Sequence, residues 1–195
     1  MRRHQAKVPL AWHVFDAPDE TGRMRRIMSV SLPESVDAWR MVSARRAFAG
    51  ELPISAMPRL CEVLADRAGV AQYEMAFGRD ELGTACLDLK VRAPVTLLCQ
   101  RTLEPFVLPL AVEVRLGMIR AENEEAGLPP GCEPLLIGAD ARLKPAEVIE
   151  DELLLALPLV PMDPQGALPA AEATSPDEDE AVANPFAILR ELKRS

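Results

Sequence analysis

The sequence has 195 residues and a net charge of −8, and 49 % of its residues are apolar while only 4 % are aromatic. That length is enough for one domain with a hydrophobic core and a short appendage. No run of about 18 apolar residues occurs, and no apolar segment follows the basic N-terminus, so neither a membrane span nor an export signal is indicated. We therefore expect a cytoplasmic protein with no membrane contact.

The charge is distributed unevenly along the chain. Residues 1–46 contain nine Lys or Arg residues against five acidic ones, whereas residues 163–183 contain six acidic residues and neither Lys nor Arg. The sequence thus has a basic N-terminal part, a middle of mixed charge and an acidic segment near its C-terminus.

The residues that most often carry chemistry are sparse. The four cysteines, at positions 61, 86, 99 and 132, are at least 13 residues apart, and His4 and His13 are the only histidines. Structural zinc sites need closely spaced ligands, so these cysteines are interpreted as reduced, mostly buried thiols. The glycines form neither a phosphate-binding nor a nucleophile motif. We predict no metal, no cofactor and no enzymatic activity.

Apolar spacing in the first third of the chain predicts two helices separated by an extended segment. The first helix is expected over Ser35 to Arg46, the extended segment over residues 47–54, and the second helix from Ser55 onward. The second helix has an apolar stripe formed by Met57, Leu60, Cys61 and Leu64.

The middle of the chain shows the clearest pattern. Apolar and polar residues alternate over residues 71–77, 85–97 and 106–118, which predicts three strands with one buried face each. A further short strand is expected at residues 135–137. Three consecutive antiparallel strands form a β-meander, and the helices on either side in sequence are its natural cover. The predicted fold is therefore α+β, with one face of the sheet covered by helices.

Two prolines fall inside the predicted strands, Pro94 in the second and Pro109 in the third. Proline has no N–H to donate to a neighbouring strand, so each is expected at a bulge or at an edge of the sheet.

A last helix is predicted from Pro145, which suits the first helical position. Acidic residues lie in its N-terminal half, where the helix dipole favours them, and residues 153–157 are all apolar and should be buried. Pro158 ends the helix, because the residue before a proline is biased away from helical geometry. Pro158, Pro161 and Pro164 then recur with the period of a polyproline II helix.

These patterns divide the chain into three parts. Residues 1–164 form the domain, and residues 165–183 are too polar and too irregular to offset their ordering entropy, so they are predicted to be a disordered acidic linker. Residues 184–195 are predicted to form a short amphipathic helix, with Asn184 as its N-cap. A helix of about ten residues is marginal alone in water and must dock on a surface.

Two segments, Glu-Asp-Glu-Leu-Leu-Leu-Ala-Leu-Pro-Leu-Val-Pro at 150–161 and Asn-Pro-Phe-Ala-Ile-Leu-Arg-Glu-Leu-Lys at 184–193, closely resemble the bacterial YceD family. These are the large ribosomal RNA subunit accumulation proteins. The resemblance covers roughly the last third of the chain and the region of Cys99, and it implies a cytoplasmic, non-enzymatic factor needed for normal levels of 23S ribosomal RNA. Its structural signature in this chain consists of Glu150, Asp151, Glu152, Pro158 and Pro161.

The resemblance also bears on metal binding. Many members of the family have a Cys-x-x-Cys motif at the position of Cys99-Gln-Arg-Thr102, and here Thr102 replaces the second cysteine. A single thiolate cannot anchor a structural zinc ion, so this departure removes the best metal candidate.

RNA binding would require positive charge directed at phosphate groups. The candidate residues are Arg45, Arg46, Arg92 and Arg101. The alternative is that the charges belong to the solvated outer face of a sheet, and no aromatic residues interleave with them to stack on bases.

Two functional hypotheses follow. In the first, the protein binds precursor 23S ribosomal RNA or a large-subunit assembly intermediate, directly or through a protein partner. In the second, it is an adaptor or chaperone for a basic ribosomal protein or an assembly factor. A short helix can bind a partner's groove, although this helix could equally fold back on its own domain, and the oligomeric state is left open. The candidate partner-binding residues are Asn184, Pro185, Phe186, Leu189 and Arg190.

Overall fold

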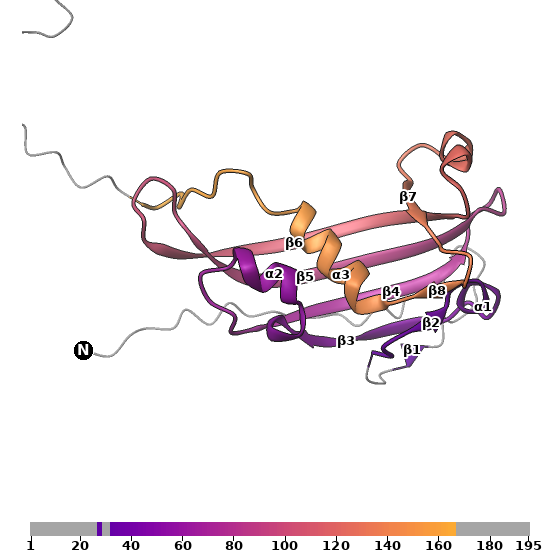
Figure 1. Ribbon diagram of the computed structural model, residues 1–195, viewed down its shortest axis with the longest axis horizontal. Coiled ribbons are helices and arrows are strands. Elements are labelled where there is room, and N and C mark those ends of the chain that lie inside the picture. The colour runs from indigo at the N-terminus through magenta and orange to yellow at the C-terminus, as the bar shows by residue number, and fades with distance from the viewer. Residues whose placement is uncertain (1–26, 29–31, 167–195) are drawn as a thin grey trace, which may run out of the picture.

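The structure, a computed structural model, describes residues 27–28 and 32–166. Its centre is a six-stranded sheet, shown in Figure 1, flanked by short helices. The predicted α+β class is confirmed. In spatial order the strands are β1 (Ile27–Met28), β3 (Ala47–Pro53), β4 (Val70–Arg79), β5 (Ala85–Leu98), β6 (Pro105–Ile119) and β7 (Glu133–Leu136).

Strands β4, β5 and β6 form the predicted antiparallel meander, and β3 extends it by a fourth antiparallel strand. Leu89 in β5 faces Met75 of β4 on one side and Val114 of β6 on the other. Leu89 is fully buried, as is every second residue from Leu87 to Val95 apart from the nearly buried Ala93, so the predicted alternation is confirmed. The sheet therefore has one apolar face that needs a cover.

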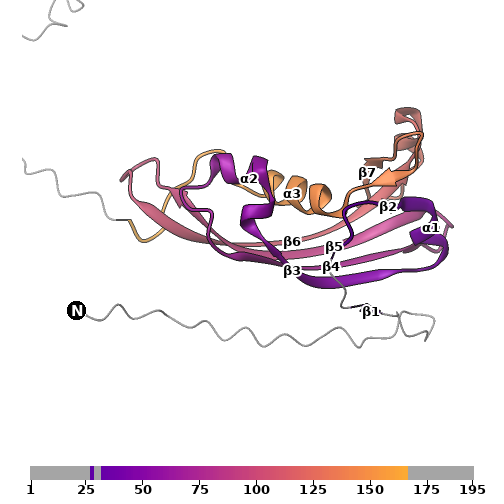
Figure 2. The ribbon, with the colours of Figure 1, turned by 60° about the horizontal axis from the view of Figure 1, so that its bottom comes forward.

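Two helices cover that face, as Figure 2 shows. They are α2 (Pro58–Val63) and α3 (Pro145–Leu155), and Leu60, Ile149 and Leu153 from them are fully buried. The last helix begins at Pro145 as predicted, but the prediction of a buried end is wrong in part, because Leu153 is fully buried whereas Leu155 on the next part of the turn is 75 % exposed. The second predicted helix starts later than Ser55, because a 3₁₀ turn, η1 (Ile54–Ala56), precedes it and Pro58 takes the first helical position.

The first predicted helix is also shorter than expected. It is α1 (Ala38–Ser43). The helix starts only at Ala38 because the side chain of Asp37 accepts a hydrogen bond from the backbone N–H of Arg40 at 2.9 Å and so caps the helix N-terminus. The preceding residues form β2 (Val36–Asp37), which pairs with β8 (Arg142–Leu143) in a two-stranded ladder. Sequence periodicity gave no sign of this ladder, since its strands are about a hundred residues apart.

The strand predicted at residues 135–137 is present as β7, which runs parallel to the end of β6 after the 3₁₀ segment η2 (Glu122–Gly127). The two prolines lie directly opposite each other, Pro94 on β5 and Pro109 on β6. Pairing of β4 with β5 ends at Arg92, and β7 pairs with β6 only from Leu116 onward. Each proline thus lies where its strand has no second neighbour among the strands described, and the prediction of an edge position is confirmed.

Several predictions fall outside the described residues. They concern most of the N-terminal 31 residues, nearly all of the acidic linker at 165–183 and the C-terminal helix at 184–195. Within the described residues, no helix has both the length and the apolar character that crossing a membrane requires.

The buried face of β5 can be tested by comparing two adjacent residues. Leu89→Asp should destabilise the domain by several kcal/mol, a large share of a typical stability of ~5–15 kcal/mol, because it buries an unpaired carboxylate. Lys90→Gln should change stability little, since Lys90 lies on the opposite face in a surface ion pair with Glu113. Chemical denaturation would measure both midpoints, and equal midpoints would contradict the assigned register.

Candidate functional site

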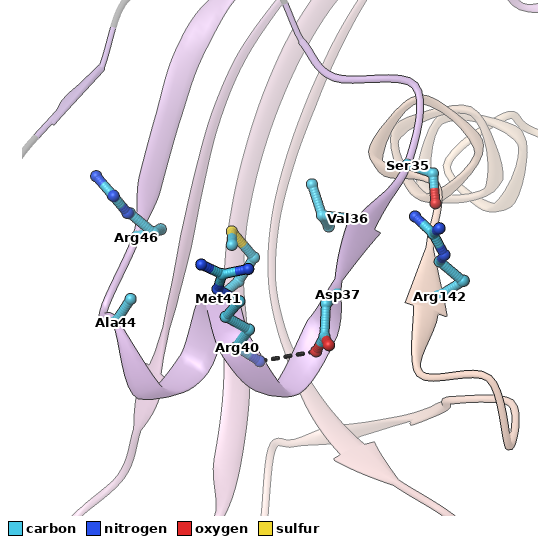
Figure 3. Close-up of a pocket in the computed structure, with 8 residues that line it drawn as sticks. All are labelled: Ser35, Val36, Asp37, Arg40, Met41, Ala44, Arg46 and Arg142. Atoms are coloured by element: carbon cyan, nitrogen blue, oxygen red, sulfur yellow. Dashed lines mark hydrogen bonds between the residues drawn. The ribbon is translucent and has the colours of Figure 1, made fainter.

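A hollow lies at the end of the molecule that carries α1 and the β2–β8 ladder, and Figure 3 shows it. Its volume is about 470 Å³. Such a volume lies within the range of about 300–1,000 Å³ that is usual for ligand clefts. Its lining residues come from β2, α1, the turn after α1 and β8, and they are Ser35, Val36, Asp37, Arg40, Met41, Ala44, Arg46 and Arg142.

The three arginines in this lining, Arg40, Arg46 and Arg142, come from separate segments of the chain. Asp37 and Arg142 are register partners in the β2–β8 ladder, and the N–H of Ala38 donates to the carbonyl of Ala141 at 2.9 Å. Arg46 is positioned by the turn that ends α1, since its N–H donates to the carbonyl of Met41 at 3.1 Å. In Figure 3 the side chain of Arg40 stands between Arg46 on one side and Arg142, beside Ser35, on the other.

The charge around this hollow is mainly positive. Among its lining residues Asp37 is the one acid, and its carboxylate is engaged by the backbone N–H of Arg40. Within the described part of the chain, the guanidinium groups of Arg40 and Arg142 have no ion-pair partner. Arg120 adds a further positive charge nearby, with its guanidinium 4.5 Å from the centre of the Trp39 ring.

Acidic residues are also present at this end. Asp140 accepts a hydrogen bond from the backbone N–H of Arg142 at 3.1 Å, and Glu34 precedes β2. The hydrogen bond to Asp140 uses the backbone of Arg142 and not its guanidinium group. The side chains that the hollow presents are therefore mainly positive, while the carboxylate of Asp37 in its lining accepts a hydrogen bond from a backbone N–H.

The four arginines predicted to bind RNA do not lie together. Arg45 and Arg46 are beside the hollow, Arg92 is on the outer face of β5, and Arg101 is in the turn after β5. The carbonyl of Arg46 pairs with Phe77, which is level with Leu87 on β5. At about 3.3 Å per strand residue, the turn after Leu98 lies roughly 35 Å from that level. RNA binding by the four residues stays a prediction, but they cannot form one patch.

Sequence reasoning missed Arg142, which completes the hollow. Its place beside Arg40 depends on the β2–β8 ladder, and no local pattern announces two-residue strands. Arg142 is a positive residue in the sequence, but without the β2–β8 ladder nothing in the predicted fold placed it near Arg40.

The outer face of the sheet carries cross-strand charge pairs. Lys90 and Glu113 approach to 2.6 Å, and Arg115 and Asp88 also approach to 2.6 Å. Such pairs are typical of a solvated sheet face and contribute little stability individually. This pattern agrees with the alternative interpretation of the strand charges given above.

The signature acids of α3 make contacts inside the fold. The Glu150 side chain is buried, and its Oε1 accepts a hydrogen bond from the N–H of Leu60 at 3.0 Å. Its Oε2 accepts from Nε and Nη2 of Arg59 at 3.1 and 2.9 Å, while Nη1 of Arg59 binds Asp151 at 2.5 Å. Met57, the N-cap residue of α2, gives no side-chain cap. Glu150 therefore supplies from another helix the acceptor that an N-cap side chain normally provides.

Glu152 differs from its neighbours because it is buried and, among the described residues, has no hydrogen-bond or ion-pair partner. Burial raises the pKa of its carboxyl group, and the negative charges of Glu133 and Asp151 raise it further. A buried carboxyl with a raised pKa is an acid–base candidate in principle.

Pro161, one of the two signature prolines, helps to fasten the chain after α3 to the turn between β5 and β6. The N–H of Gln100 donates to the carbonyl of Pro161 at 2.8 Å, and the N–H of Asp163 donates to the sulfur of Cys99 at 3.3 Å. The hydroxyl of Thr102, which contributes most, and the backbone N–H of Asp163 donate to the Cys99 sulfur and lower the pKa of its thiol to about 7. Arg101 continues the attachment by donating to the carbonyls of Asp163 and Gly166.

Among the described residues, no group of three or more His, Cys, Asp or Glu residues is placed to hold a metal ion. Thr102 donates to the Cys99 sulfur at the position where a second thiol would be required. The absence of a structural metal stays a prediction.

Comparison with known proteins decides the family. The family model described as large ribosomal RNA subunit accumulation protein YceD matches residues 87–193, from β5 through α3 to the C-terminal segment. The large ribosomal RNA subunit accumulation protein YceD of Haemophilus influenzae is 30 % identical over 173 residues, which cover 86 % of this chain and 99 % of that protein. The chain belongs to the YceD family. No solved structure matches it.

Membership in the YceD family confirms the resemblance found in the sequence. The matched region includes the turn of Cys99, the acids of α3 and the prolines that follow it. Of the three arginines of the hollow, Arg142 lies inside the region matched by the family model, while Arg40 and Arg46 lie before that region.

The link between α3 and α2 can be tested at Glu150. Glu150→Ala should lower the free energy of unfolding by about 1–2 kcal/mol, because the N–H of Leu60 loses the acceptor that caps α2. Glu147→Ala is the matched control, since Glu147 is exposed and its ion pair within the described residues is with Lys144 at the same end of the helix. Thermal or chemical unfolding would measure both, and equal effects would show that the cap is dispensable.

Glu152 gives a prediction of pH dependence. A carboxyl whose pKa is raised in the folded state destabilises the fold once the pH exceeds its unfolded pKa, and this penalty is complete above its folded pKa. Glu152→Gln removes the penalty, so the variant should gain stability relative to the natural chain as the pH rises from 4 to 8. Unfolding midpoints across that range would show this, whereas a constant difference would contradict burial of an unpaired carboxylate.

Proposed function

We propose that this protein is a non-enzymatic, cytoplasmic factor of bacterial ribosome assembly that supports the synthesis, processing or stability of 23S ribosomal RNA. One observation carries this proposal. A relative named for the accumulation of large ribosomal subunit RNA is aligned with this chain over 99 % of its own length. Because the alignment covers nearly the whole relative, the relative has no additional domain that could carry its role in place of the aligned part.

The hollow at the α1 end supports contact with precursor 23S RNA or a large-subunit assembly intermediate. Positive side chains from Arg40, Arg46 and Arg142 gather there in a protein whose net charge is −8. An acidic protein has little general attraction for RNA, so contact requires a local concentration of positive charge.

The non-enzymatic part of the proposal is supported by the roles of the α3 acids. Glu150 and Asp151 are engaged by Arg59, and Glu150 also holds the N–H of Leu60. Paired carboxylates for acid–base chemistry would need to face a substrate cleft. These two instead stabilise the contact between helices.

A second function, an adaptor or chaperone for a basic ribosomal protein or assembly factor, is favoured by one specific observation. The chain that leaves α3 exposes a row of large apolar side chains, and exposed apolar patches mark protein-binding surfaces. These side chains are Leu155, Leu159, Val160 and Met162.

The proposal can be tested by deleting the gene in the bacterium that carries it and measuring the ratio of 23S to 16S RNA. We expect the ratio to fall and the full-length chain to restore it. An unchanged ratio in the deleted strain would contradict the proposal, because the protein would then have no role in large-subunit RNA levels.

A chain truncated after Ala183 separates the tail from the domain in the same experiment. We expect the truncated chain to remain folded, since the helix predicted at 184–195 follows a long polar linker, yet to restore the RNA ratio incompletely. Full restoration would show that the tail is dispensable. Loss of folding would show that it belongs to the core.

A further inference from the structure

The geometry points to the hollow formed by Arg40, Arg46 and Arg142 as a binding site for the phosphate groups of an RNA backbone. This inference rests on the proposed function and names the surface through which it would act. It goes beyond the sequence-based candidates, because it keeps Arg46 and replaces the other three with Arg40 and Arg142.

The first argument is the arrangement of the guanidinium groups. Arg40 extends from α1, Arg46 precedes β3 and Arg142 lies on β8, so three separate elements direct positive charge around one hollow (Figure 3). A guanidinium presents several N–H donors in a planar fork that matches a phosphate group.

The second argument concerns the positive charge that is left for a ligand. The carboxylate of Asp37, which lines the hollow, accepts the backbone N–H of Arg40 and thereby caps α1. Across the described residues, the guanidinium groups of Arg40 and Arg142 are paired with no carboxylate. Two exposed charges without partners can be neutralised by an incoming phosphate without first breaking an ion pair.

The third argument concerns the mode of recognition. Trp39, next to Arg40 on α1, would be the natural platform for stacking an RNA base, but Arg120 covers one face of its ring and the residue packs against the core. Base stacking is therefore not the main contact at this site. The hollow should recognise the backbone of folded RNA with little dependence on base sequence.

The test compares two double variants of the full-length chain that remove the same charge. Arg40→Gln with Arg142→Gln alters the hollow, whereas Arg67→Gln with Lys90→Gln removes two positive charges away from it, since Arg67 follows the bridge of Asp66 with Thr96 and Lys90 lies on the outer face of β5. The probe is a set of labelled transcripts that tile the 23S RNA, and affinity is measured between about 50 and 300 mM salt. Thermal unfolding of each variant checks that the fold persists.

We expect the hollow variant to bind about tenfold more weakly near 100 mM salt and to reduce the slope of log affinity against log salt by about 1.5, since two phosphate contacts are lost. The control variant should change both quantities little. Addition of inorganic phosphate at constant ionic strength should leave RNA binding unchanged.

Four outcomes would overturn the inference. Equal losses in the two variants would indicate diffuse attraction, and no loss in the hollow variant would place the RNA contact elsewhere. Competition by inorganic phosphate would assign the hollow to the free anion. If the natural chain binds none of the transcripts at micromolar concentration while gene deletion still lowers the 23S ratio, this inference fails and the proposed function stands, with a protein partner in place of RNA.

Discussion

The contact on which the rest of the structure depends is the one between the Glu150 carboxylate and the start of α2. The apolar face of the sheet is covered by two short helices that lie far apart in the sequence, and α2 has only six residues. A helix so short is unstable alone and has unsatisfied N–H groups at its start. Glu150 satisfies one of these groups and holds Arg59 as well, so the two helices form a single cover. Burying a carboxylate is costly, and three donors to its two oxygens offset that cost.

The position of α3 in turn sets both ends of the molecule. Before the helix, Arg142 and Leu143 form β8, and their pairing with β2 places Arg142 across from the start of α1. After the helix, Pro161 and Asp163 fasten the chain to the β5–β6 turn at Cys99. A shift of α3 would therefore move the arginine hollow and the exposed apolar segment together.

The parts of this fold that could be predicted from sequence are those encoded by local patterns. The alternation in residues 71–118 specified three strands and their buried faces, and Pro145 and Pro158 marked the beginning and approximate end of α3. The cap by Glu150, the β2–β8 ladder and the short first helix were not predictable in this way, because each depends on contacts between distant residues. For the same reason, only part of the candidate site could be predicted from the sequence. Arg46 was identified by its charge, but Arg142 joined it only through the ladder, and Arg101 was separated from it by the length of β5.

The two functional hypotheses place their contacts at opposite ends of the molecule. The arginines gather at the α1 end, while Leu159 and Met162 are exposed near the β5–β6 turn. Because the chain as a whole is acidic, its net field repels RNA, and attraction is confined to the region where the arginines are concentrated. In the proposed contact with RNA, this charge distribution would place the hollow toward the RNA and the apolar segment away from it. In that orientation a protein partner can bind the apolar segment without competing for the arginines, so contact with RNA and contact with a protein are compatible on one molecule.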